Sequence, residues 1–230
     1  MIIPAILEKD FDEVKRKIKL VEDVAEKIQV DVIDNTIVEG NTFTNIQDLG
    51  NLKINTELTV HLMVEDPLKY INKSKRFIVF KTTKIAGVST VITQLINESD
   101  LEIFIKVAKK IGYKVGVSIN HDQKISLFEK FINDIDLVQF MGVIPGKQGG
   151  ELIPSVLDKI AKFKSTFPSI TTQIDGGVND YNFHDILKTG VDNVVIGSAI
   201  FNTENPKQKF MEFSNLFNER KTAHGRDSYN

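Results

Sequence analysis

Two aspartates, Asp31 and Asp175, each belong to a short apolar run, and they lie far apart in the chain. Burying a carboxylate among β-branched residues is costly, so an acid in such a place usually has a partner or a chemical task. Two acids that meet in one cavity can act as general base and general acid in a proton transfer. His61, inside the apolar run 59–63, is a third titratable group of this kind, although a single histidine there is more typical of a hydrogen-bonded core residue.

Glycines follow three successive apolar runs in the second half of the chain. Because glycine lets backbone N–H groups come close to an anion, such loops can hold a phosphate group. One glycine turn after a strand is weak evidence, since most such glycines only make a tight turn. Three in succession predict a phosphorylated small molecule as the ligand. The loop residues are Gly146, Gly149 and Gly150, then Gly176 and Gly177, then Gly197 and Ser198.

The elements that must position these groups alternate between strand-like apolar runs and segments of helical periodicity. This alternation is typical of parallel strands joined by crossover helices. Eight such units predict an α/β fold, a closed (β/α)8 TIM barrel, with a doubly wound open sheet as the alternative. The predicted strands are 2–7, 27–33, 57–63, 90–95, 114–119, 137–141, 171–175 and 193–196, and the predicted helices are 11–26, 46–54, 67–79, 100–111, 123–133, 154–167, 181–188 and 206–219.

In a (β/α)8 barrel, the place of a residue along its strand indicates at which end of the barrel the residue lies. Chemistry in such barrels lies at the carboxyl ends of the strands, and phosphate groups are often held by the loops after the last strands. Asp31, His61 and Asp175 lie at or near strand ends, so we expect one cavity to receive all three and the glycine loops. Asp66 and Asn205, each followed by proline, are predicted to cap helices. Residues 1–220 are predicted to form one barrel, and 221–230 a polar, frayed tail.

Composition narrows the class of partner and the compartment. The chain has 29 Lys and Arg against 31 Asp and Glu, a net charge of -2, which gives no general attraction to nucleic acid or to an anionic membrane. Cysteine is absent, which excludes disulfides and thiolate zinc sites. No apolar run approaches the ~18 residues of a membrane span, and Met1 leads directly into a strand-like run without signal-peptide features. We therefore expect a cytoplasmic protein, and the sequence leaves a homo-oligomer open.

Several motifs resemble, in order and spacing, the ribulose-phosphate 3-epimerases, which are (β/α)8 barrels of the ribulose-phosphate-binding type. The most specific are His61-Leu62-Met63, Asp175-Gly176-Gly177 and Gly197-Ser198-Ala199-Ile200-Phe201. The match covers nearly the whole chain, through segments 3–7, 30–34, 60–67, 116–120, 141–146, 174–178 and 197–201.

The resemblance implies a proton shuttle at the carbon next to the ketone of a ketose phosphate. One aspartate removes the proton from one face, the other returns a proton to the opposite face, and a divalent metal stabilises the enediolate. Asp31 and Asp175 occupy the two catalytic positions, and together with His61, and with Gln29 as a further candidate, they form the implied metal site. The implied substrate and phosphate contacts are Ala5, His61, Met141, Gly146, Gly149, Gly176, Gly177, Gly197 and Ser198.

The chain also departs from the family pattern. Gln29 and Gln94 stand where the family usually has histidine, Ala5 stands where a substrate-binding serine is usual, and the loop after the sixth strand carries Lys147, a candidate phosphate contact. A glutamine oxygen binds hard cations better than zinc-like ones. The predicted cofactor is therefore a divalent ion, Zn, Mn, Fe, Co or Mg, weakly held or absent.

Two function hypotheses follow. The first is an epimerase acting on ribulose 5-phosphate and xylulose 5-phosphate or on a related sugar phosphate. The alternative is a catalytically impaired sugar-phosphate-binding or regulatory protein on the same barrel, which the three departures would explain. A lyase or decarboxylase on a related barrel is less favoured, because no strand here ends with a lysine among aspartates.

Overall fold

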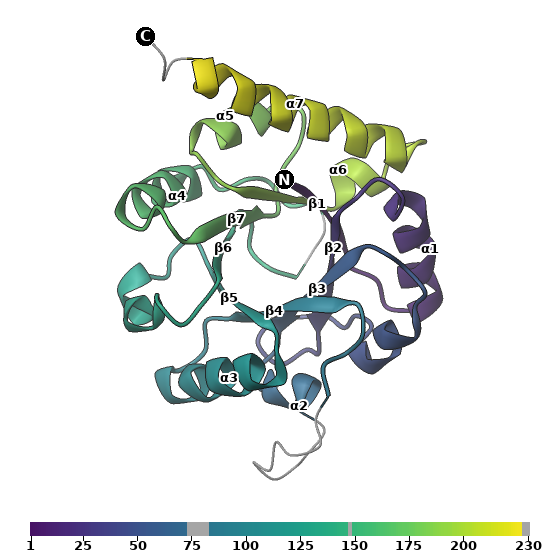
Figure 1. Ribbon diagram of the computed structural model, residues 1–230, viewed down its shortest axis with the longest axis vertical. Coiled ribbons are helices and arrows are strands. Elements are labelled where there is room, and N and C mark those ends of the chain that lie inside the picture. The colour runs from purple at the N-terminus through teal and green to yellow at the C-terminus, as the bar shows by residue number, and fades with distance from the viewer. Residues whose placement is uncertain (73–82, 147–148, 227–230) are drawn as a thin grey trace.

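In the computed structural model, eight parallel strands close into a barrel in chain order (Figure 1). The structure describes residues 1–72, 83–146 and 149–226, with side chains described up to residue 220. The closed sheet confirms the predicted TIM barrel and excludes the doubly wound alternative. The strands are β1 (Ile2–Ile6), β2 (Lys27–Ile33), β3 (Glu57–Met63), β4 (Val88–Gln94), β5 (Lys114–Ile119), β6 (Leu137–Met141), β7 (Thr171–Asp175) and β8 (Asn193–Ile196).

Helices surround the barrel and connect its strands (Figure 1). Six strands have the predicted bounds, whereas β1 ends one residue earlier and β4 is shifted toward the N-terminus. The helices are α1 (Phe11–Val21), α2 (Leu68–Ile71), α3 (Glu98–Ile111), α4 (Ser155–Thr166), α5 (Phe183–Lys188), α6 (Ser198–Phe201) and α7 (Pro206–Arg226), and the 3₁₀ segments are η1 (Ile46–Asn51), η3 (Ile125–Leu127) and η4 (Glu129–Phe131).

One of the two predicted caps is confirmed. Asn205 Oδ1 accepts a hydrogen bond from Gln208 N (3.1 Å) at the start of α7. Asp66 does not cap α2, so that prediction was wrong. The helix begins at Leu68, and its cap position is Pro67, which already has helical φ and ψ of -69° and -21° and no side-chain cap bond.

The helix predicted over 123–133 is replaced by the two 3₁₀ turns η3 and η4. Phe128 between them has φ -131° and ψ 2°, which lies outside α-helical values and interrupts the segment. The predicted helix over 46–54 is likewise the 3₁₀ segment η1.

A lysine from α4 holds the backbone that leads into η3. Lys159 Nζ is part-buried and donates to three backbone oxygens of this loop. These oxygens point toward the ammonium rather than along a helix axis, so the chain enters η3 as a turn. They belong to Asn120 (3.3 Å), His121 and Gln123 (2.8 Å).

The ends of α1 and α7 also differ from the prediction. α1 ends at Val21 rather than residue 26, and the oxygen of Glu22, just past its end, accepts a hydrogen bond from Thr56 Oγ1 (2.6 Å). Helix α7 continues to Arg226, so the helical backbone runs past residue 219 into the segment predicted as a frayed tail.

Parts of two predictions lie outside the described residues. Within the helix predicted over 67–79, α2 is described as four residues, and 73–79 are not described. Residues 227–230 of the predicted tail are also not described.

The main core lies between the barrel and its helices. Buried side chains of α3 at positions 101, 104 and 108, and of α4 at positions 156, 160 and 163, follow the three- and four-residue spacing of one helix face. They pack in one cluster with outward-facing strand residues such as Val30, Val117 and Phe140. Fully burying an apolar side chain of this size stabilises the fold by about 1.5–3 kcal/mol.

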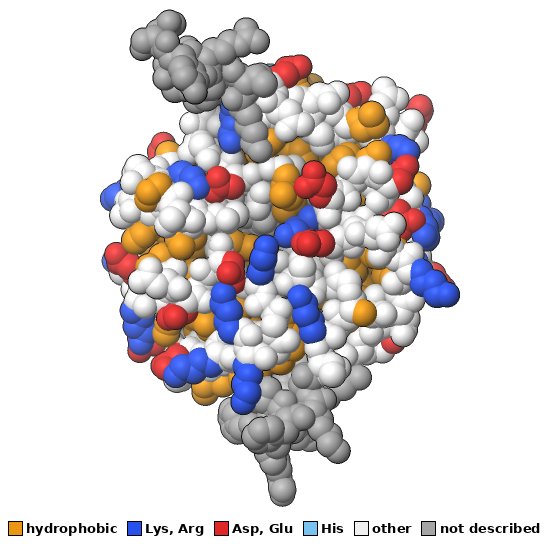
Figure 2. Space-filling view, in the orientation of Figure 1, with side chains coloured by type: hydrophobic (Ala, Val, Ile, Leu, Met, Phe, Trp, Pro, Cys, Tyr) orange, Lys and Arg blue, Asp and Glu red, His pale blue; other side chains and the backbone are white. Residues whose placement is uncertain are grey.

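Charged side chains of both signs are interspersed over the face of the molecule shown in Figure 2. Several form exposed pairs, such as Lys106 with Glu102 (2.5 Å) on α3. Each exposed pair of this kind contributes about 0–1 kcal/mol, so the fold depends little on them. Among the helices of the described residues, none has the length and apolar character needed to cross a membrane.

Candidate active site

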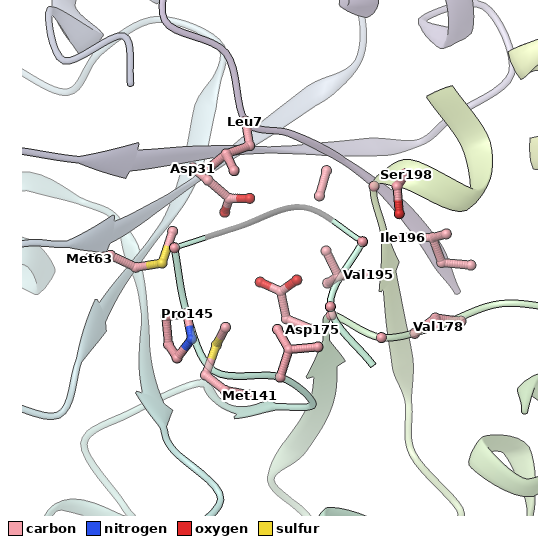
Figure 3. A pocket seen from close by; sticks show the side chains of 18 residues that line it. Leu7, Asp31, Met63, Met141, Pro145, Asp175, Val178, Val195, Ile196 and Ser198 are labelled. Carbon is pink, nitrogen blue, oxygen red and sulfur yellow. The ribbon is translucent and has the colours of Figure 1, made fainter. Parts of the chain in front are cut away.

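The carboxyl ends of β2, β3 and β7 bring the two predicted acids and the histidine together. Side chains alternate between the two faces of a strand, so Asp31 shares the inner face of β2 with Gln29. Asp31 is in register with His61 on β3, and Asp175 is the last residue of β7. Figure 3 shows the carboxyl groups of Asp31 and Asp175 directed into the same cavity.

The three titratable side chains are buried and in contact. His61 Nδ1 lies 3.1 Å from Asp31 Oδ1 and 3.5 Å from Asp175 Oδ2. One ligand atom from each residue lies within 4.8 Å of the others. His61 is fully buried, and the two aspartates are 8% and 7% exposed, which leaves an edge of each carboxylate open to a ligand.

Gln29 connects the two carboxylates. Its Nε2 donates to Asp31 Oδ1 (2.8 Å) and to Asp175 Oδ2 (2.7 Å). The amide is fully buried beneath the pair. The structure therefore directs the nitrogen of Gln29, rather than its oxygen, toward the acids.

Two more buried glutamines support the site, and the sequence analysis missed both. Gln139 Nε2 donates to Asp175 Oδ2 (2.9 Å) and contacts His61 Nδ1 (3.1 Å). Gln173 Nε2 donates to the oxygens of Gln29 (2.9 Å) and Gln139 (2.7 Å). A signal for them existed: each lies two residues before a residue predicted to belong to the site, Met141 or Asp175, and so shares its face of the strand.

Burial and mutual contact raise the pKa values of His61 and Asp31. Burial disfavours the charged imidazolium, but hydrogen bonds to Asp175 and Asp31 and the charges of both acids outweigh it and raise the pKa of His61 to about 9. Burial, followed by the negative charge of Asp175, raises the pKa of Asp31, against the opposing hydrogen bonds of His61 and Gln29. The cluster is therefore suited to hold and to release a proton.

The acids face a cavity of about 570 Å3, including its open mouth, at the carboxyl end of the barrel (Figure 3). His61 does not line it but lies behind Asp31, and Lys147 lies outside the described residues. Among the predicted substrate and phosphate contacts, those that line the cavity are Ala5, Met141, Gly146, Gly149, Gly176, Gly177, Gly197 and Ser198.

Gly176 and Gly177 need the absence of a side chain. They have φ values of 94° and 75°, which favour glycine. A Cβ on Gly177 would lie 2.7 Å from Cα of Leu152, and one on Gly176 would lie 2.5 Å from a methyl carbon of Val143. The tight turn keeps the backbone of this loop against the cavity, on the side where α6 begins with Ser198.

Gln94 lies apart from the acids. It lines a neighbouring hollow together with Glu65 and Asn120, and its Nε2 is 3.5 Å from His61 Nε2. The structure therefore brings Gln94 to the edge of the site without placing it against either carboxylate.

The donor set fits a divalent cation. Two carboxylates and one imidazole within 4.8 Å of one another offer three ligands, and catalytic metal sites commonly combine three protein ligands with open positions for water or substrate. The Gln29 nitrogen cannot act as a ligand, because an amide NH2 group only donates.

The chain is thus a closed (β/α)8 barrel with two buried acids, a histidine and a glycine-lined cavity at its carboxyl end, the face where barrel enzymes carry their active sites. Residues 1–201 match the Ribulose-phosphate 3 epimerase family. The chain belongs to this family.

Individual relatives agree with this membership over most of their length. The chain is similar to the ribulose-phosphate 3-epimerase of Bacillus subtilis (30% identity, 92% of this chain and 96% of that protein). It is also similar to the ribulose-phosphate 3-epimerases of Aquifex aeolicus (26%, 94% and 96%) and Escherichia coli (27%, 90% and 92%).

Solved structures share the fold. The 3-hexulose-6-phosphate synthase of Salmonella typhimurium has a TM-score of 0.71 at 16% identity, covering 95% of this chain and 99% of that one. A mutant tryptophan synthase α-subunit from Pyrococcus furiosus has a TM-score of 0.71 at 16% identity, covering 93% and 97%. At this identity the likeness concerns the barrel alone.

Proposed function

We propose that the protein epimerises a ketose phosphate, ribulose 5-phosphate and xylulose 5-phosphate or a related sugar phosphate, by proton transfer between Asp31 and Asp175. The observation that carries the proposal is the meeting of two buried carboxylates from β2 and β7 at one cavity. Membership of the Ribulose-phosphate 3 epimerase family supports it. Inversion of a carbon centre needs an acid–base group on each face, and two carboxylates meet that requirement.

In this mechanism the phosphate end of the substrate lies against the loops of Gly176, Gly177 and Ser198. The carbon next to the ketone then lies between the two acids. One aspartate removes its proton, which leaves an enediolate, and the other returns a proton to the opposite face. Positioning of this kind supplies much of the rate enhancement, because the reacting groups are already in place.

His61 and Gln29 hold the acids in position for these steps. The imidazole and the amide donate to the carboxylates, and so limit their rotation and lower the cost of burying them. Asp31, whose pKa is raised, is suited to carry the proton that is delivered.

Asp31, His61 and Asp175 would hold a divalent ion. When bound, such an ion supplies Lewis-acid stabilisation of negative charge on substrate oxygens. The two carboxylates would then serve both as ligands and as proton carriers, and the imidazole as a ligand.

A sugar-phosphate-binding or regulatory protein is the second candidate function. One observation favours it: Gln29 directs an amide nitrogen toward the acids, which weakens the case for a full metal site. Such a protein would bind a sugar phosphate in the glycine-lined cavity without converting it.

Exchange of the carbon-bound proton separates the two candidates. Purified protein is incubated in deuterated water with ribulose 5-phosphate, xylulose 5-phosphate and ketohexose phosphates, with Mn2+ or Mg2+ and with a chelator. We expect deuterium at the carbon next to the ketone of at least one substrate, together with its epimer. Binding of these sugars without deuterium incorporation under any of the conditions would favour the binding protein and reject the epimerase.

A further inference from the structure

Three buried glutamines form a continuous hydrogen-bonded chain beneath the two acids. Gln173 Nε2 donates to Gln29 Oε1 (2.9 Å) and to Gln139 Oε1 (2.7 Å). Gln29 and Gln139 both donate onward to Asp175 Oδ2, at 2.7 and 2.9 Å, and Gln29 also reaches Asp31 Oδ1 at 2.8 Å. All three glutamines are at most 1% exposed. We call Gln29, Gln139 and Gln173 the amide chain.

The direction of the amide chain follows from the atoms that surround it. Asp175 Oδ2 faces one amide end of Gln29 and one of Gln139, and a carboxylate oxygen accepts, so both ends are NH2 groups. The oxygens of Gln29 and Gln139 must then face Gln173, and its NH2 group has two protons, one for each. The Gln173 oxygen accepts from Asn193 Nδ2 (3.4 Å). Turning any one amide would set oxygen against oxygen in a dry interior.

Register explains why the chain can form. Gln139 and Gln173 are direct partners in the β6–β7 pairing, and each points to the inner face of the barrel. Gln29 lies across the barrel from them on β2 and closes the link to Asp31. In the dry interior these bonds do not compete with water, which strengthens each of them.

We infer that the amide chain positions Asp31 and Asp175 and fixes Gln29 as a hydrogen-bond donor, so that a cation in this site is bound by Asp31, His61 and Asp175 without Gln29. The inference rests on the proposed function for the role of the acids. Gln173 is its central residue: it touches neither carboxylate, so its effect on the acids passes through the other two amides. The amide chain consists of positioning residues, not catalytic ones.

The first test removes the central amide. Gln173→Leu deletes the donor to both neighbours, which lets Gln29 and Gln139 rotate. We expect kcat to fall about 10- to 100-fold, as for other outer residues that orient site ligands, while KM stays within about threefold because the phosphate loops are intact. Gln173→Met serves the same purpose if the leucine variant does not fold. An unchanged kcat in a folded variant would overturn the inference.

Thr59→Val is the matched control. Thr59 is buried on the inner face of β3 in register with Gln29. The substitution removes a hydroxyl from the same layer of the barrel and conserves the shape of the side chain. We expect kcat within about threefold of the wild type. A loss equal to that of Gln173→Leu would mean that any change in this layer disturbs the acids, which would also overturn the inference.

The second test asks whether Gln29 is a metal ligand. Mn2+ binding is measured for the wild type, for Gln173→Leu and for Gln29→Met, which conserves length and removes the amide. If Gln29 only positions the acids, Gln29→Met should weaken Mn2+ binding no more than Gln173→Leu does, since both variants disturb the amide chain and neither removes a ligand. Binding at least about tenfold weaker in Gln29→Met than in Gln173→Leu would show an oxygen ligand and reject the inference.

A third readout does not depend on turnover. In the wild type without substrate, the side-chain NH2 protons of Gln29 and Gln139 should exchange slowly with solvent, and Gln173→Leu should accelerate them. This result would support the amide chain even if deuterium incorporation into substrate failed and removed the proposed function. Equal exchange in both proteins would reject the amide chain even in an active epimerase.

Discussion

The inner and outer faces of the barrel strands differ in almost every physical respect. Along β2, Val30 and Val32 point outward into the apolar core, whereas Gln29 and Asp31 point inward. The outer face is stabilised by removal of apolar area from water. The inner face buries polar groups whose cost is offset only by complete hydrogen bonding. Stability and chemistry thus lie on opposite sides of the same strand.

The two faces should therefore respond differently to substitution. A buried group of charges contributes little net stability, even though breaking it leaves unpaired partners. The apolar layer tolerates no loss of volume without a cost in stability, and of its buried side chains Val178 and Ile196 also line the cavity. Activity and stability can be changed separately by choosing the face.

The largest effect is expected on the inner face. Asp175→Asn removes one of the two proposed proton carriers, because an amide cannot exchange that proton, and should lower kcat by about 10²- to 10⁴-fold. Its free energy of unfolding should change little, because the lower cost of burying a neutral amide opposes the loss of a charged partner of His61. Deuterium exchange and urea denaturation measure the two quantities. Asp136→Asn, an acid just before β6 that pairs with Lys109, is the control and should keep full kcat. Similar values of kcat for Asp175→Asn and the wild type would show that activity does not depend on this acid of the inner face.

The opposite pattern is expected on the outer face. Phe163 on α4 is fully buried and packs edge-on against Phe140 of β6, with ring centroids 5.4 Å apart. Phe163→Ala should lower the free energy of unfolding by about 3–5 kcal/mol and leave kcat per folded molecule nearly unchanged. Urea unfolding and assays well below the melting temperature check both. A large loss of kcat in the folded variant would show that the two faces are coupled.

A smaller effect should follow from the shifted pKa of His61. The folded pKa is about 9 against 6.5 for a free histidine, so the stabilisation is complete below pH 6.5 and is lost as the pH rises through 9. The raised pKa of Asp31 acts in the same direction, beginning above 3.8. The His61 contribution is on the order of 3 kcal/mol. Urea unfolding with a chelator, from pH 6 to 10, measures it.

His61→Gln is the reference for this pH dependence. It removes the titrating ring, so its unfolding free energy should change less between pH 6.5 and 9 than that of the wild type. Equal slopes for the two proteins would show that other groups cause the dependence.

Much of the barrel was predictable from sequence because its strands begin abruptly. Lys27, Glu57 and Lys114 each open a strand at the rim of the barrel, and buried residues follow at once. A charge next to an apolar run fixes the boundary within a residue. The segment 123–133 could not be predicted in this way, because the contact that shapes its entry comes from Lys159, which is distant in sequence.

The site was predictable only in part. Asp31, His61 and Asp175 attract notice because a charge or an imidazole inside an apolar run is costly. Gln139 and Gln173 carry no charge and titrate in no accessible range, so only their partners in space reveal their role. Because side chains two residues apart share a face of a strand, Met141 and Asp175 would have placed both glutamines on the inner face. The sequence could not show that their amides are hydrogen-bonded to one another.

The clamp made by Lys159 has a consequence for how this molecule can vary. One ammonium gathers the carbonyls of the loop after β5, so the path of that loop is set largely by main-chain oxygens, together with Gln123 Oε1, which accepts from Asn120 N (2.9 Å). Substitutions at the exposed positions of the loop should be tolerated, whereas insertions that carry a carbonyl beyond the lysine's reach should not. Engineers who wish to graft new sequence onto this rim therefore have freedom of composition but not of length.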